Sequence, residues 1–193
     1  PGVGPGGVPA PAGARAGALV AAPPAADGAA VPDPEALEHY LSGRLHEERD
    51  MDAEALEEYL RALELDPGRA AIERRISETC SRLGDARRAL EYALLAQQHD
   101  PGDARSHWLA GSAMFNLGRP SQALTELRTA VTADPGQPAY WRTLAHVAEV
   151  LGRLDQVAEG WRRVLELDDG DAEAWFQLAA AEARLGRFEA ADS

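Results

Sequence analysis

The segment from His46 to Asp50 reads His-Glu-Glu-Arg-Asp and begins like the zinc-protease motif H-E-x-x-H. In that motif two histidines on one helical face bind the metal, and the glutamate acts as a general base. Here Asp50 stands where the second histidine must be. His39 lies two helical turns before His46 and could touch the same ion, but both fall on the face expected to pack against neighbouring helices. We therefore predict no metal site.

The remaining reactive residue types form no catalytic group. Cys80 is the single cysteine, and the segment Glu78 to Asp85 offers it no base, so we expect a buried, inert thiol. Gly2 to Gly7 matches the dinucleotide fingerprint G-x-G-x-x-G, but neither the strand nor the helix that this motif needs is present around it. We predict a chain that is not an enzyme and that binds no cofactor.

The overall charge narrows the classes of partner. The 193 residues carry 19 Lys plus Arg against 32 Asp plus Glu, a net charge of −13. Nucleic acid and anionic membrane surfaces repel such a chain, and no apolar run is long enough to span a bilayer. We predict a protein or peptide partner. The composition, rich in Ala, Arg and Gly and without Lys, favours a bacterial source.

Residues 1–34 differ in composition from the rest, with seven glycines, eight prolines and no aromatic residue. Such a segment buries too little apolar surface to offset the entropy of ordering, which predicts a disordered tail or linker. Within it, Ala16 to Ala22 is about as long as the core of a minimal secretory signal. Both a cytoplasmic and an exported location are compatible with the sequence.

From residue 35 onward the sequence repeats at a constant interval. Asp-Pro-Gly begins at Asp66, Asp100 and Asp134, and Asp-Asp-Gly begins at Asp168. A second break between these turns places one glycine per unit, at the same interval: Gly84, Gly118, Gly152 and Gly186. Apolar residues between the breaks recur every three or four positions, which predicts helices. Glycine readily ends a helix with positive φ, proline cannot continue a helix, and aspartate can cap the next one. Each unit is thus predicted to be a helical hairpin.

The repeat also predicts how the helices pack. Small residues recur at the eighth, twentieth and twenty-seventh positions of each unit, counted from Ala36, and let two antiparallel helices approach closely. Larger residues such as Tyr59, Leu127 and Trp161 fill the seams between them. Because one hairpin cannot bury its own apolar side, stacking of hairpins predicts an all-α solenoid.

At this point the chain resembles the tetratricopeptide repeat (TPR) family, whose units are about 34 residues long, as they are here. One unit follows the family pattern at Trp141, Leu144, Ala145, Gly152, Trp161 and Val164, and the next at Trp175, Leu178, Ala179, Gly186, Phe188 and Ala191. The resemblance covers about four and a half units, near residues 36–69, 70–103, 104–137, 138–171 and 172–193, the last of them truncated. The sequence departs from the family pattern at Ser42, Asp50 and Asp169. Met51 lies one residue away from its expected position in the repeat, which predicts an irregular first turn.

The resemblance implies that the first helix of each unit lines a concave groove. The groove positions carry six arginines against five glutamates, so the acidic excess lies elsewhere. The fifth residues of the units alternate between aromatic and arginine: Tyr40, Arg74, Trp108, Arg142 and Phe176. These five residues are groove candidates, and the other five candidates are Arg44, Arg82, Arg105, Phe115 and His146.

Two interpretations of these candidates remain open. Aromatic and arginine side chains are frequent anchors of interfaces, and arginine pairs with carboxylates by two parallel hydrogen bonds, which favours a groove for a peptide with apolar and acidic side chains. In the other interpretation the aromatics pad contacts between units and the arginines are solvated. The Lys and Asn clamp with which some TPR domains hold the C-terminal carboxylate of chaperones is absent, because the corresponding sites are Tyr40, Arg44, Arg74 and Glu78.

We predict a non-enzymatic interaction scaffold that binds a protein or peptide in this groove. Two alternatives stay open. The array could be the recognition arm of a larger enzyme or regulator. It could also be an exported scaffold of envelope assembly or secretion, with the Pro/Gly/Ala-rich segment as a spacer.

Overall fold

The computed structural model describes residues 32–186 of the chain. The predicted tail up to residue 31, with its fingerprint match and its signal-like stretch, lies outside the described residues, as do Phe188 and Ala191. The described part is helical and contains no strand. In order, the helices are α1 (Pro34–Glu47), α2 (Asp52–Leu65), α3 (Ala70–Arg82), α4 (Ala86–His99), α5 (Ala104–Asn116), α6 (Pro120–Ala133), α7 (Pro138–Val150), α8 (Leu154–Leu167) and α9 (Ala172–Arg184).

Short polar signals set the helix boundaries. Asp33 accepts hydrogen bonds from the amides of Glu35 and Ala36, so α1 begins at Pro34, one residue before the predicted start of the array. The aspartates of the repeated triplets do not cap the following helix as predicted. Asp66, Asp100, Asp134 and Asp168 instead close the preceding helix. The N-cap lies three residues later, where Asp103 and Asp171 accept amide hydrogen bonds.

The turn inside each hairpin is the same in all described units. Gly84, Gly118, Gly152 and Gly186 have φ between 68° and 78°, as predicted. Asp50 takes the equivalent place with φ 56°. The amide of Met51 donates to the His46 carbonyl at 3.0 Å, and the amide of Asp85 donates to the Cys80 carbonyl at 2.9 Å one unit later. The prediction of an irregular first turn is therefore wrong, because aspartate tolerates the left-handed conformation better than most residues.

The small repeat positions lie at the contact between paired helices. Ala55, Ala89, Ala123, Ala62, Ala96 and Ala130 are fully buried, as are Tyr59, Leu127 and Trp161, which fill the seams. A Cβ at Gly111 would lie 2.7 Å from the Leu127 Cγ atom, so α5 and α6 approach as closely as a glycine allows. Ala179 is only partly buried, and the helix expected to cover it falls outside the described residues.

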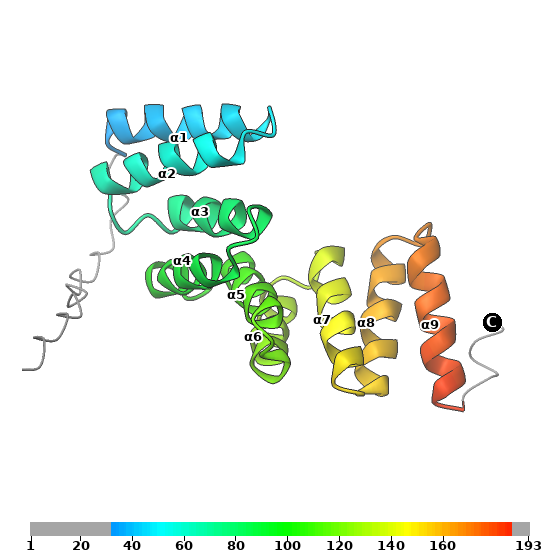
Figure 1. The fold of residues 1–193 in the computed structure, drawn as a ribbon. Helices are drawn as coiled ribbons and strands as arrows, with labels where there is room; N and C mark the ends of the chain where they lie inside the picture. The colour runs from blue at the N-terminus through cyan, green and yellow to red at the C-terminus, as the bar shows by residue number, and fades with distance from the viewer. Residues whose placement is uncertain (1–31, 187–193) are drawn as a thin grey trace, which may run out of the picture.

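The hairpins stack in chain order and form a solenoid (Figure 1). The direction of the helix axes changes along the stack. Helices α1–α4 lie at the left of the picture, and α7–α9 lie at the right with their axes turned relative to them. First helices of neighbouring units touch, as α3 touches α5 and α5 touches α7, whereas the described second helices make no comparable contact with one another. The first helices therefore lie closer together and form the inner, concave side, and the second helices form the outer side.

Candidate partner-binding surface

The ten groove candidates all lie on first helices. They are Tyr40 and Arg44 on α1, Arg74 and Arg82 on α3, Arg105, Trp108 and Phe115 on α5, Arg142 and His146 on α7, and Phe176 on α9. We call the surface that these helices present the first-helix face.

Three of the candidates converge on one hollow. Tyr40, Arg74 and Arg105, from α1, α3 and α5, line a pocket of about 70 Å³ together with Ala71, Arg75 and Glu78. An adjoining pocket of about 240 Å³ shares Tyr40 and Ala71 with it and is lined by Leu37 and Ile72. A charged hollow and an apolar one thus lie side by side across the first helices of the first three units.

The groove arginines are paired with carboxylates of the chain itself. Arg74 Nη1 lies 2.6 Å from Asp103 Oδ1, Arg105 Nε lies 2.5 Å from Glu78 Oε1, and Arg142 binds Asp171. The same holds for all six arginines counted at groove positions, the others being Arg44 with Glu47, Arg82 with Glu47 and Asp52, and Arg184 with Glu149. Arg44 and Glu47 lie on the same helix, whereas the pairs of the other five arginines link one unit to the next or one helix to another. Those five arginines are therefore not simply solvated.

Glu47 is the centre of a network that joins α1 and α3. Its carboxylate lies 2.6 Å from Arg82 Nη2 and 3.7 Å from Arg75 Nη1, and it accepts a hydrogen bond from Thr79 Oγ1 at 3.2 Å. Burial raises the pKa of Glu47, but the hydrogen bond from Arg82 and the charges of Arg82 and Arg75 outweigh burial and hold the pKa below its ordinary value. Glu47 therefore stays ionised and fixes both arginines.

Asp103 shows the same balance of effects. Burial raises the pKa of its carboxyl, and the hydrogen bonds from Arg74 and Ser106 lower the pKa further than burial raises it. Asp103 also caps α5, so one ionised side chain fixes both a helix start and a groove arginine.

The aromatic candidates mostly pack between elements. The Trp108 ring stacks on Tyr140 of the next unit at 5.5 Å between centroids, and its Nε1–H donates to Thr143 Oγ1 at 3.0 Å. The Tyr40 and Tyr59 ring centroids are 5.7 Å apart, the His146 and Trp161 rings lie nearly perpendicular with centroids 5.0 Å apart, and Phe115 packs against the core. Phe176 is 72% exposed. The aromatics therefore do not form one continuous exposed strip.

Sequence reasoning missed three residues that shape this face. Arg75 lies in the pocket although its repeat position was not assigned to the groove, and Asp103 and Asp171 hold the groove arginines. A signal for the aspartates was available. Asp103 follows Arg74 at the same interval at which Asp171 follows Arg142, whereas that interval leads from Tyr40 and Trp108 to Arg69 and Gln137.

The residues considered for metal or nucleophilic chemistry have structural surroundings. His39 Nδ1 lies 2.7 Å from Glu58 Oε2, and within residues 32–186 no three potential ligands gather to hold a metal ion. Cys80 is fully buried, and burial raises the pKa of its thiol. No helix of the described part is both long and apolar enough for a bilayer crossing.

The comparisons with known proteins agree on the fold. Residues 81–147 match the family model described as tetratricopeptide repeat, and a search of curated proteins finds no significant match. The structure of MamA, residues 41 to the end, from Desulfovibrio magneticus RS-1 shares 16% identity with a TM-score of 0.74, over 84% of this chain and 92% of that one. YrrB, described as a TPR protein with an unusual peptide-binding site, shares 21% identity with a TM-score of 0.67, over 81% and 80%.

A third similar structure is the first TPR of Spaghetti (RPAP3) bound to the HSP90 peptide SRMEEVD. It shares 18% identity with a TM-score of 0.61, over 65% of this chain and 99% of that one. At these identities the similarity concerns the fold. The stacked hairpins with a constant repeat interval, the match to the tetratricopeptide repeat model over residues 81–147 and the shared fold together show that the chain contains tetratricopeptide repeats and has the fold of TPR proteins.

Proposed function

We propose that this chain is a scaffold that docks a peptide or protein segment along the first-helix face. The observation that carries the proposal is the convergence of Tyr40, Arg74 and Arg105 on one hollow beside an apolar pocket. A charged hollow next to an apolar one suits a segment in which acidic and apolar side chains alternate. We also propose that the binding array begins with α1 at Pro34 and that the residues before α1 are a tail.

The ion pairs prepare the arginines for such a partner. A guanidinium carries five N–H donors, so Arg74 can keep its bond to Asp103 and still donate to a ligand carboxylate. Because the pairs already restrict the side chains, less conformational entropy is lost when a ligand binds. The Leu37 and Ile72 pocket would receive the neighbouring apolar side chain.

Two of the similar structures are described as binding peptides: YrrB with its unusual site and the RPAP3 repeat with SRMEEVD. These descriptions support a peptide ligand in general. The Lys and Asn clamp remains absent from this sequence, so we do not propose the C-terminus of a chaperone as the partner.

The test uses two defined fluorescent heptapeptides, one alternating Glu with Leu and one alternating Lys with Leu, and the full chain. We expect fluorescence anisotropy to show tighter binding of the Glu–Leu peptide, with an affinity that falls as salt is added. In the variant Arg74→Gln/Arg105→Gln this affinity should fall about tenfold or more, equivalent to about 1.4 kcal/mol.

The matched control is Arg87→Gln/Arg119→Gln, which removes two exposed arginines outside the pocket. It changes the net charge equally and should leave binding unchanged. Equal loss in both variants would mean that only the overall charge matters, and no loss in either would place the peptide elsewhere. Both results contradict the proposed face, provided that far-UV circular dichroism shows an intact helical fold.

A further inference from the structure

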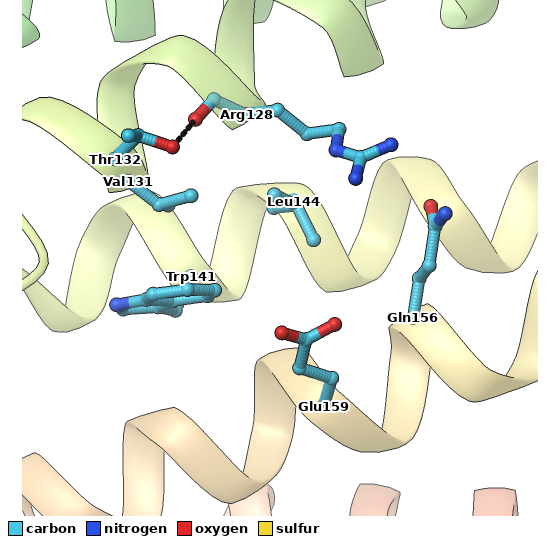
Figure 2. Close-up of a pocket in the computed structure, with 7 residues that line it drawn as sticks. All are labelled: Arg128, Val131, Thr132, Trp141, Leu144, Gln156 and Glu159. Atoms are coloured by element: carbon cyan, nitrogen blue, oxygen red, sulfur yellow. Dashed lines mark hydrogen bonds between the residues drawn. The ribbon is translucent and has the colours of Figure 1, made fainter.

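The outer side of the solenoid has an open pocket where the third and fourth units meet (Figure 2). It has a volume of about 140 Å³ and lies over α7, between the second helices α6 and α8. Val131, Trp141 and Leu144 supply its apolar surface, and Arg128, Gln156 and Glu159 supply the polar groups around it. In the close-up Arg128 extends from α6, and Gln156 and Glu159 rise from α8 on the other side.

The pocket continues into two neighbouring hollows. It shares Arg128 and Thr132 with a hollow of about 520 Å³ on α6, and Trp141 with one of about 420 Å³ that reaches Pro135 and Leu167. We call the three together the second-helix trough. Its elongated form, built from shared walls, suits an extended chain better than a compact small molecule.

The preceding unit differs at the corresponding seam. There a hydrogen-bonded network of Gln97, His107 and Glu126 joins α4, α5 and α6. Gln97 Nε2 lies 2.9 Å from Glu126 Oε2, and His107 Nδ1 lies 2.8 Å from the same oxygen. One repeat later these positions are Val131, Trp141 and Gly160. These residues cannot form the same network, and Gly160 packs directly against α7, since a Cβ there would lie 2.9 Å from that of Ala145.

At one end of the trough Arg163 pairs with Glu166, 2.6 Å between Nη1 and Oε2, and lies over the Trp141 ring. Arg128 and Glu159, beside the central pocket, have no ion-pair partner among residues 32–186. Arg162, one repeat after Arg128, binds Glu182, but Ala148 occupies the place that corresponds to Glu182 in the earlier unit. In the described part of the chain Arg128 therefore pairs with no carboxylate, and Glu159, which lies across the pocket in Figure 2, pairs with no cation. The Oε1 atom of Gln156 is buried without a hydrogen-bond partner, which is unfavourable for a polar atom in a folded protein.

We infer that the second-helix trough docks a linear peptide segment of another protein in which an apolar side chain lies between an acidic and a basic residue. The apolar side chain rests on Trp141 and Leu144. The acidic residue pairs with Arg128, the basic residue pairs with Glu159, and a backbone N–H of the peptide donates to Gln156 Oε1. Each group that lacks a partner in the free chain gains one, and charge complementarity fixes the direction of the peptide.

This site is separate from the first-helix face and does not depend on the function proposed for it. The trough uses α6, α8 and one side of α7, whereas the hollow that carries the proposed function is lined by α1, α3 and α5, and the variants of the two sites share no residue. A chain that uses both would connect two partners on opposite sides of one solenoid.

The test is an NMR titration of the ¹⁵N-labelled full chain with the capped peptide acetyl-Glu-Gly-Leu-Gly-Lys-amide. The chain has four tryptophans, so four indole N–H signals report on separate sites. We expect the peptide to shift the Trp141 indole signal and the Gln156 side-chain amide while leaving the Trp108 indole unchanged. A peptide with Ser in place of Leu should bind about tenfold more weakly or not at all, because the apolar contact is lost.

The variant Arg128→Gln/Glu159→Gln removes both unpaired charges and leaves the net charge unchanged. It should weaken binding at least about tenfold, whereas the matched control Arg87→Gln/Glu91→Gln, on the exposed side of α4, should not. Binding that persists in the first variant, or that shifts Trp108 instead of Trp141, overturns the inference. A Trp141 signal that moves on dilution without peptide would mean that a second copy of the chain occupies the trough, which also overturns it.

Discussion

Single small residues decide how closely the paired helices approach. At Gly111 the missing side chain leaves room for Leu127, which is fully buried between α5 and α6. The backbone oxygen of Ala123 lies 3.1 Å from the place of a Cβ, so no side-chain movement alone would make room for one. The identity of one residue therefore sets the spacing of a whole helix pair.

We predict that Gly111→Ala destabilises the chain by about 1–3 kcal/mol, because overpacking outweighs the gain of about 1 kcal/mol in helix propensity. Urea unfolding followed by circular dichroism measures the change. Asn116→Ala, on an exposed position of the same helix, is the control and should stay within about 0.5 kcal/mol. A stabilised Gly111→Ala variant would show that the helices separate at no cost.

At the scale of elements, the turn inside each hairpin determines where the second helix starts. Its geometry recurs at Asp50 and Gly84 with the same hydrogen bond across the turn. Space is not the constraint at Gly84, since a Cβ there would meet nothing within 4 Å. The requirement is conformational, because positive φ disfavours residues with a side chain.

This comparison predicts opposite effects of two substitutions. Asp50→Gly should stabilise the first hairpin, and Gly84→Ala should destabilise the second, each by about 1 kcal/mol, because only the strain at positive φ changes. Thermal and urea unfolding of both variants provide the measurement. Effects of the same sign would contradict a shared turn conformation.

At the scale of the whole molecule, histidine–carboxylate bonds join the two helices within each of the first three units. His39 bonds to Glu58 in the first unit and His107 to Glu126 in the third, at equivalent positions. In the second unit the first helix supplies the carboxylate and the second helix supplies the histidine, with His99 Nδ1 2.8 Å from Glu73 Oε2. The surroundings of the carboxylates differ. The hydrogen bond from His39 lowers the pKa of Glu58, whereas burial raises the pKa of Glu73.

These opposite shifts predict opposite pH trends. A lowered folded-state pKa gives stability that is present above the ordinary glutamate value of 4.5 and is lost as the pH falls through the folded pKa. The stability advantage of the wild type over Glu58→Gln should therefore shrink on acidification below about pH 4.5.

For Glu73 the sign is reversed. A raised folded-state pKa gives stability that is present at low pH and is lost as the pH rises through the folded pKa. The wild type should gain stability relative to Glu73→Gln as the pH falls. Unfolding free energies across pH 3.5 to 7, about the range in which glutamates titrate, measure both trends, with the exposed Glu57→Gln as control. Parallel trends for the two variants would contradict the assignment.

The repeat period alone was enough to predict the hairpins, their order and the small residues at their contacts. Each unit satisfies the same local constraints, so residues such as Gly84 and Ala89 have counterparts at the same position of other units. This repetition made the prediction possible. The helical location of the ten groove candidates follows from the same period. Local details were harder to predict. Asp50 adopts a conformation that the pattern reserves for glycine, and Asp100 closes one helix instead of capping the next.

The partners of individual side chains were decided by the tertiary structure. Whether Arg74 is free or paired depends on where Asp103 comes to lie, and whether Trp108 is exposed depends on Tyr140 of the next unit. The open trough at Trp141 likewise depends on how α6, α7 and α8 come together. The sequence by itself determined the fold because a period is written into consecutive residues. The surfaces were determined only by the folded chain. They depend on contacts between units, and a repeat pattern specifies neither the distances between the residues in contact nor their side-chain conformations.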